Sequence, residues 1–257
     1  MSDIHKTAIV SSKAELGSDV VIGPYAIIEE NVIIGDGTTV GSSAVIAAGA
    51  RLGSNVKVYH GAVIGTQPQD LKFGGEESEA FIGDDTVVRE YATINRGTKA
   101  SGATRVGKDC LLMAYSHVAH DCYIGDKVIM ANSVNLAGHI EIDEYAIIGG
   151  VVPVHQFVKI GAHCMIGGGF RVQQDICPYA LVAGYPLKVV GINAIGLRRR
   201  GFAKDTIKAL ETSFKILFFS DLNTTQAVER IKNELELIPE VQLILDFIDR
   251  SDRGMVK

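Results

Sequence analysis

Residues 22–46 read IGPYAIIEENVIIGDGTTVGSSAVI, and a large apolar residue occupies every sixth position of this stretch. The same series covers residues 4–64, 82–94 and 106–172 without a polar member. An α-helix repeats every 3.6 residues and a strand every 2, so a sustained period of six indicates a repeat architecture.

The position two residues before each large apolar residue is usually small or β-branched, as at Ala26 and Val32. Residues two apart on a strand point to the same side, so each hexad supplies one small and one large inward side chain. Glycine often follows the large residue, as at Gly23 and Gly35, and we expect these glycines to adopt corner conformations closed to other residues. The pattern predicts an all-β coil of short, stacked strands over residues 1–190.

The period fails where a step of six lands on Asp70, Glu76 and Ala100. Carboxylates cannot occupy a dry core without partners, so we expect loops to leave the coil near residues 66–81 and 99–104. Loops on a rigid scaffold are where function concentrates.

A small α-helical domain is predicted over residues 191–257, where the hexads stop and Lys, Glu, Leu and Phe recur at helical spacing. We expect Asp205 to cap one helix, Thr224 or Thr225 to cap a second, and Pro239 to open the last. The helices should cover the end of the coil.

The composition restricts the function. The 257 residues carry 25 Lys and Arg against 30 Asp and Glu, and this net charge of −5 argues against a nucleic-acid-binding protein. No signal peptide opens the chain and no apolar run approaches the roughly 18 residues of a membrane span, so we expect a cytoplasmic protein without an integral membrane segment. Cys110, Cys122 and Cys164 fall at the small inward position, where we expect packed, reduced thiols.

Five of the seven histidines lie in the second half of the coil: His117, His120, His139, His155 and His163. By hexad position His120 and His139 occupy outward or corner positions, which makes a buried core role improbable. A solvated surface histidine is the ordinary alternative, but Asp121 beside His120 favours an imidazole oriented by a carboxylate for proton transfer.

Two other classes of protein are weighed against an acid–base enzyme. A zinc enzyme like the β-helical carbonic anhydrases would use three histidines, but His117 and His120 point to opposite sides of an extended chain unless a corner intervenes, so we expect no metal. A non-enzymatic β-solenoid would show the same hexads without needing the histidine cluster or the Gln-Asp-Leu-Lys sequence of residues 69–72.

Five segments occur in a specific order: PQDLKFGGE at 68–76, SHVAHDC at 116–122, AGH at 137–139, VHQF at 154–157 and GLRRRGF at 196–202. Together they closely resemble the UDP-N-acetylglucosamine O-acyltransferases of lipid A synthesis, and the likeness covers essentially the whole chain. The resemblance implies a left-handed parallel β-helix of hexapeptide repeats, a homotrimer, and active sites between neighbouring subunits.

The resemblance also implies a reaction. It is the transfer of an (R)-3-hydroxyacyl group from acyl carrier protein to the 3-hydroxyl of UDP-N-acetylglucosamine, with no metal, cofactor or covalent intermediate. By position, His120 would be the general base, Asp121 would orient it, and the Gly138 N–H would stabilise the oxyanion.

The resemblance assigns substrate contacts to the positions that match its motifs. The sugar and acyl groups would be held by Gln69, Asp70, Lys72, His117, His139 and Gln156, the nucleotide by His155 and Asn193, and the phosphates or carrier by Arg199 and Arg200. Gly168 matches the floor position that limits acyl length, and its lack of a side chain suggests room for a long chain.

Three questions stay open at this level. Ile195 stands where the family pattern has an acidic residue toward the ribose, so nucleotide affinity would rest on other groups. The acyl chain length and a 3-amino analogue of the sugar are undecided. A related N-acyltransferase is the less favoured reading, because it would carry a uridine-binding domain before the coil, whereas the repeats here begin at Ile4.

Overall fold

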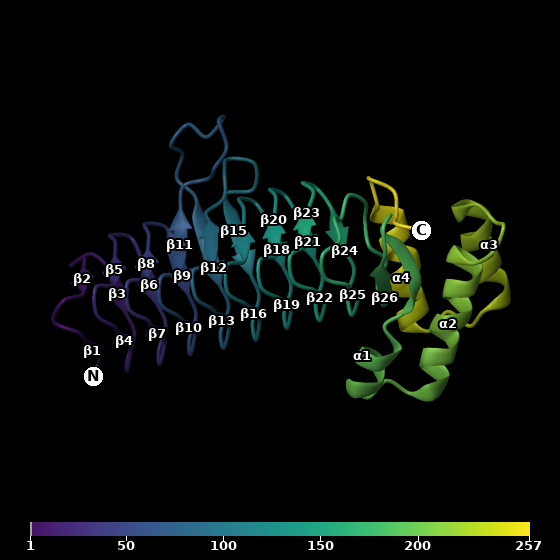
Figure 1. The fold of residues 1–257 in the computed structure, drawn as a ribbon, viewed down its shortest axis with the longest axis horizontal. Helices are drawn as coiled ribbons and strands as arrows, with labels where there is room; N and C mark the ends of the chain where they lie inside the picture. The colour runs from purple at the N-terminus through teal and green to yellow at the C-terminus, as the bar shows by residue number, and fades with distance from the viewer. Residues whose placement is uncertain (1) are drawn as a thin grey trace.

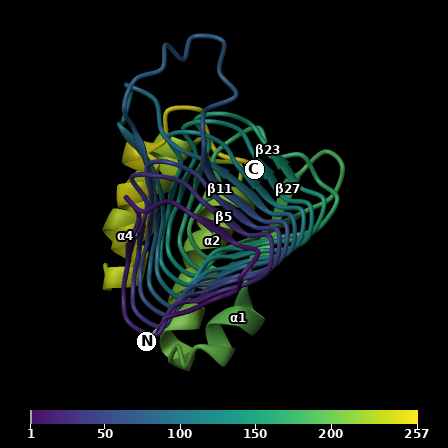
Figure 2. The same ribbon diagram turned by 90° about the vertical axis from the view of Figure 1, so that its left-hand side faces the viewer.

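The structure is a computed structural model that describes residues 2–257. The chain forms a left-handed parallel β-helix with three sheets, followed by four helices at its C-terminal end (Figure 1). Seen along its axis the coil has a roughly triangular outline (Figure 2). The fold class predicted from the hexads and the resemblance is confirmed.

Up to β25, each sheet takes every third strand of the chain. The first contains β1 (Asp3–Ile4), β4 (Val21–Ile22), β7 (Thr39–Val40), β10 (Lys57–Val58), β13 (Val87–Val88), β16 (Leu111–Leu112), β19 (Ile129–Met130), β22 (Ile147–Ile148), β25 (Met165–Ile166), β26 (Ala180–Ala183) and β27 (Lys188–Ile192). The second contains β2 (Ile9–Val10), β5 (Ile27–Ile28), β8 (Val45–Ile46), β11 (Val63–Thr66), β14 (Thr93–Asn95), β17 (His117–Val118), β20 (Asn135–Leu136) and β23 (Pro153–Val154). The third contains β3 (Glu15–Leu16), β6 (Ile33–Ile34), β9 (Ala50–Leu52), β12 (Glu79–Ile82), β15 (Ala103–Val106), β18 (Tyr123–Ile124), β21 (Glu141–Ile142) and β24 (Lys159–Ile160). All neighbouring strands pair in parallel except β26 and β27.

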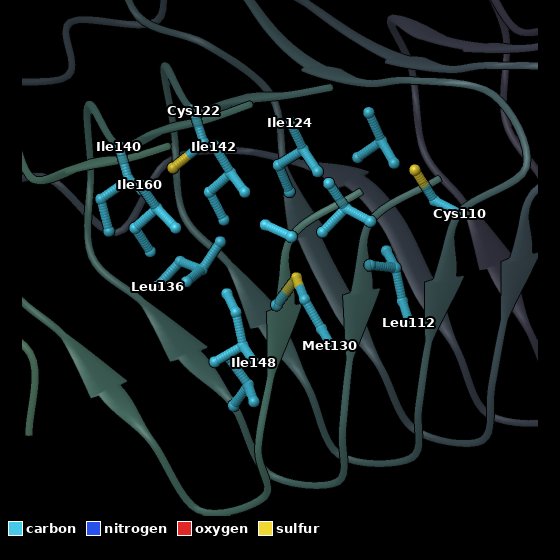
Figure 3. Close-up of a cluster of buried hydrophobic side chains, with 14 of the residues drawn as sticks. Cys110, Leu112, Cys122, Ile124, Met130, Leu136, Ile140, Ile142, Ile148 and Ile160 are labelled. Carbon is cyan, nitrogen blue, oxygen red and sulfur yellow. The ribbon is translucent and has the colours of Figure 1, made fainter. Parts of the chain in front are cut away.

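The large residue of each hexad forms the core. Where no loop intervenes, stacked residues are 18 positions apart, as in the pair Ile28↔Ile46, and both side chains of that pair are about 1% exposed or less. Figure 3 shows large residues such as Leu112, Met130 and Ile148 from successive coils filling the interior, with Cys110 and Cys122 at the small inward position beside them. All four cysteines are free and buried, which confirms the packing role predicted for three of them.

The reason for the corner glycines differs from the one expected. The left-handed backbone conformation belongs to another position, which holds non-glycine residues such as Asp121 (φ +59°) and His139 (φ +61°). Gly35 follows the large residue and has no such φ, but a Cβ there would lie 2.6 Å from the carbonyl carbon and oxygen of Gly53 in the next coil. These glycines are required by close stacking of the coils.

The two loops project from the same corner of the triangle, between the second and third sheets (Figure 2). The first spans residues 67–78 between β11 and β12, and the second spans residues 96–102 between β14 and β15. We call them the long loop and the short loop.

The helices are α1 (Ala194–Arg199), α2 (Lys204–Phe218), α3 (Thr224–Glu234) and α4 (Pro239–Arg250). Pro239 opens α4 as predicted. The other two cap predictions are wrong. Ala203 occupies the N-cap of α2 with Asp205 in its first turn, and Asn223 caps α3 because its side chain and that of Gln226 form a reciprocal capping box.

The helices contact β27 at the end of the coil, chiefly through α2. No helix within residues 2–257 has the length and apolar character to cross a bilayer.

Candidate active site

The corner between the second and third sheets gathers most of the predicted site residues. It consists of residues 119–122, 137–140 and 155–158 on three successive coils, together with the long and short loops. We call it the site corner. Because stacked positions are 18 apart, His120 lies over Gly138, and Asp121 lies over His139.

His120 and Asp121 form a hydrogen-bonded pair at this corner. Nδ1 of His120 lies 2.7 Å from Oδ2 of Asp121. The side chain of Asp121 is fully buried, whereas that of His120 keeps 13% exposure. The bond to Asp121 engages Nδ1, so Nε2 is the ring nitrogen left for a substrate.

The short loop supplies three further hydrogen bonds to Asp121. The backbone N–H of Thr98 and the hydroxyl of Ser101 donate to Oδ1 at 2.9 and 2.5 Å, and the Thr98 hydroxyl donates to Oδ2 at 2.8 Å. Burial alone would raise the pKa of the Asp121 carboxyl, but the hydrogen bonds from Ser101, His120 and Thr98 outweigh it and lower the pKa to about 2. Asp121 is therefore an anion at neutral pH.

Gly138 keeps the space before His120 open. A Cβ at this position would lie 2.7 Å from Cε1 and 2.9 Å from Nε2 of His120. Residue 138 is buried, and among the backbone bonds of the described residues its N–H donates none while its carbonyl accepts from Phe157. An unused N–H beside the reactive face of an imidazole suits a developing oxyanion.

Two more histidines surround the pair. His139 meets His120 edge-to-face with ring centroids 5.1 Å apart, and its Nε2 lies 3.8 Å from Oδ2 of Asp121. Nδ1 of His117 is hydrogen-bonded to the Thr93 hydroxyl at 2.7 Å. Desolvation, and then the charge of His120, lower the pKa of His117. A corner does intervene between His117 and His120, so the argument that they diverge fails.

The long loop and the third coil supply the remaining predicted groups of this corner. Oδ1 of Asp70 accepts from the backbone N–H of Lys72, and the Gln69 and Lys72 side chains are exposed. On the coil that follows His139, Nδ1 of His155 contacts the carbonyl of Gln156, whose side chain is exposed.

Three predicted residues lie at another corner, between the third and first sheets. Asn193 caps α1 and donates to the carbonyl of His163, so its side chain is already engaged. Arg200 donates to the carbonyl of Tyr145 at 2.8 Å, whereas Arg199 is exposed. Gly168 lies on the turn after β25, at neither of these corners, and is exposed. Within a single chain, these four predicted residues are therefore not part of the site corner that holds His120.

Three side chains of the site corner lie close enough together to be considered as metal ligands. The ligand atoms of His120, Asp121 and His139 lie within 4.8 Å of one another. However, a carboxylate offers about four lone-pair positions, and Asp121 already accepts four hydrogen bonds. A metal ion would have to displace one of them, so the arrangement fits a hydrogen-bonded pair better than a metal centre.

Thr98 and Ser101 are site residues that sequence reasoning missed. The broken period located their loop, but a loop without periodicity carries no signal for where its side chains return.

Comparison with known proteins identifies the family of the chain. The model of UDP-N-acetylglucosamine O-acyltransferase domain 2 matches residues 175–256, and that of the six-repeat bacterial transferase hexapeptide matches residues 13–48 and 103–138. The acyl-[acyl-carrier-protein]–UDP-N-acetylglucosamine O-acyltransferase of Thiobacillus denitrificans is 48% identical over the full length of both chains.

Solved structures give the same result. The UDP-N-acetylglucosamine acyltransferase LpxA of Bacteroides fragilis has a TM-score of 0.97 at 44% identity, covering 99% of this chain and 100% of its own. LpxA of Acinetobacter baumannii has a TM-score of 0.95 at 41% identity, covering 99% of both chains. This chain therefore belongs to the acyl-[acyl-carrier-protein]–UDP-N-acetylglucosamine O-acyltransferase family and is an acyltransferase.

Proposed function

We propose that this protein transfers an (R)-3-hydroxyacyl group from acyl carrier protein to the 3-hydroxyl of UDP-N-acetylglucosamine, the first step of lipid A biosynthesis, in the cytoplasm. Family membership supports the reaction class, since the names of its relatives specify both substrates. The observation that carries the proposal is the buried His120–Asp121 pair, whose free Nε2 faces a space that Gly138 keeps open.

The mechanism is general-base attack. Nε2 of His120 takes the proton of the sugar 3-hydroxyl while that oxygen attacks the thioester carbonyl, and the Asp121 anion stabilises the imidazolium. The Gly138 N–H stabilises the oxyanion. Collapse breaks the C–S bond, His120 returns its proton to the departing thiolate, and no covalent enzyme intermediate, metal or cofactor takes part.

The substrate contacts in this proposal are those that the family resemblance assigns to matching positions. Asp70, Lys72 and Gln69 on the long loop hold the sugar, and His117, His139 and Gln156 complete the sugar and acyl contacts. His155 contacts the nucleotide. Gly168 leaves room at the far end of a long acyl chain.

A homotrimer would complete the site. Six half-buried apolar residues run in register along the outer face of the first sheet: Val87, Leu111, Ile129, Ile147, Met165 and Leu181. A continuous apolar stripe of this kind is typical of a subunit interface. In the trimer a neighbouring copy would supply its Asn193, Arg199 and Arg200 to the phosphates or the carrier at the first copy's site corner, because these residues lie at another corner of their own chain.

The assignment of His120 is tested by His120→Ala, assayed by mass spectrometry with UDP-N-acetylglucosamine and hydroxyacyl carrier proteins of several lengths. We expect turnover to fall about a hundredfold or more. His5→Ala is the matched control, because His5 is exposed at the first coil and should leave turnover unchanged. Near-normal turnover of His120→Ala would refute the mechanism, and acylation of only the 3-amino sugar would change the substrate.

A shared site is tested by complementation. Chains carrying His120→Ala are refolded together with chains carrying Arg199→Ala. If each site combines one chain's His120 with its neighbour's Arg199, about a quarter of the sites in random trimers regain both groups. Activity above the mean of the two separate variants supports the trimer, and activity equal to that mean contradicts a site shared in this way.

A further inference from the structure

We propose that Thr98 and Ser101 of the short loop are positioning residues, which fix the Asp121 carboxylate and through it the orientation and basicity of His120. The proposal rests on the proposed role of His120 as general base. The side-chain hydrogen bonds of Thr98 and Ser101 run to Asp121 and to the backbone of Ala100 and Ala103, so we infer that both residues act through Asp121.

The short loop is built for this contact. Asp121 accepts three hydrogen bonds from one loop of the preceding coil, and its own backbone N–H donates to the Thr104 hydroxyl just beyond that loop. Thr98 is itself buried, at 6% exposure, so water cannot replace its hydroxyl freely. The carboxylate therefore has one stable orientation, with Oδ2 directed at His120.

The short loop is in turn tied to the long loop. Glu76 accepts from the backbone N–H of Lys99 at 3.0 Å and from that of Gly74 at 2.8 Å. The Glu76 carboxylate thus joins the long loop, which carries Asp70 and Lys72, to the short loop, which holds Asp121. It fixes the proposed substrate contacts relative to the His120–Asp121 pair.

The two hydroxyls also set how strongly Asp121 attracts the His120 proton. Thr98 and His120 both donate to Oδ2. If the Thr98 hydroxyl is removed, more of the negative charge on Oδ2 is available to the imidazolium, and His120 keeps its proton to a higher pH. The other titratable groups that face the pair are His139 and His117, which are unchanged by this substitution.

The test compares pH profiles of kcat/KM. Thr98→Val keeps the side-chain volume but loses the hydroxyl, and we expect kcat about tenfold lower and the acid limb shifted up by about half a pH unit. Ser101→Ala should produce the same changes at smaller size. Thr98→Ser restores the hydroxyl and should restore the profile, and Lys99→Ala, whose side chain makes none of these bonds, is the matched control.

The outcomes separate the two proposals. A fall in kcat without a shift of the acid limb, or no change, overturns the positioning role. If Thr98→Val does not fold, as judged by circular dichroism, Ser101→Ala decides the question because Ser101 is exposed. Full activity of His120→Ala would instead remove the proposed function itself.

Discussion

Replacing Gly35 by Ala should destabilise the coil although it changes only one methyl group. The added Cβ would lie 2.6 Å from the carbonyl carbon and oxygen of Gly53 and 2.7 Å from the N of Ser54. All three are backbone atoms of the next coil and cannot rotate away. Relief requires the coils to separate by nearly 1 Å, which also stretches the 2.9 Å bond from the Gly35 N–H to the carbonyl of Leu52.

Overpacking of this kind costs about 1–3 kcal/mol, and a weakened hydrogen bond adds about 1 kcal/mol. We therefore expect a loss of about 3 kcal/mol, which for a chain of this size lowers Tm by about 6–12 °C. Gly74→Ala is the control, since its nearest neighbour would be Glu76 Oε2 at an ordinary 3.5 Å. Thermal unfolding followed by circular dichroism measures both, and a Tm within 2 °C of the control would refute the stacking argument.

Three further predictions concern the site and its surroundings. Gly138→Ala should lower turnover about a hundredfold while leaving Tm nearly unchanged, because the methyl group fills the space before His120 Nε2, and activity near that of the unmodified chain would contradict this role. The pKa of Asp121 in the folded chain is about 2, below its unfolded value, so Asp121 contributes about 2 kcal/mol to the free energy of unfolding above pH 4, and this contribution is lost as the pH falls through about 2. Urea unfolding should therefore show the difference in stability between the unmodified chain and Asp121→Asn becoming smaller over that pH range. Desolvation, and then the charge of Arg200, lower the pKa of His163 to about 4. The unfolded chain therefore protonates this histidine at a higher pH than the folded chain does, and the free energy of unfolding decreases as the pH falls from about 6.5 to 4. His163→Phe should lose less stability over that pH range, and equal losses would contradict the burial argument.

The coil could be predicted from the sequence because its signal is repeated. Every hexad reports the same inward pair of positions, so a single exception such as Cys110 in place of Ala is recognised by its register. The two loops were located for the same reason, as places where the repeat fails. Helix starts have no such redundancy, and Ala203 and Asn223 occupy the N-caps where Asp205 and Thr224 were expected.

The candidate site was only partly within reach of sequence reasoning. His120 and Asp121 are neighbours in the chain, so their pairing could be proposed directly. Thr98 and Ser101 lie 20 or more residues before Asp121, and their contact depends on how an aperiodic loop folds back onto the next coil. Hydrogen bonds to Asp121 and Glu76 set the conformation of this loop, and no local sequence pattern predicts these bonds.

Coil length explains why the site forms at one corner. Where stacked positions are 18 residues apart, His120 leads to Gly138 and then to Gln156, and Asp121 leads to His139. An extra residue on the coil between Asp121 and Gly138 would rotate every later inward residue outward and would also break this column. Insertions can therefore enter only where the chain leaves the coil at a corner and returns to the same register. Both loops do so on the coils just before His120, and the short loop thereby brings Thr98 and Ser101 to Asp121.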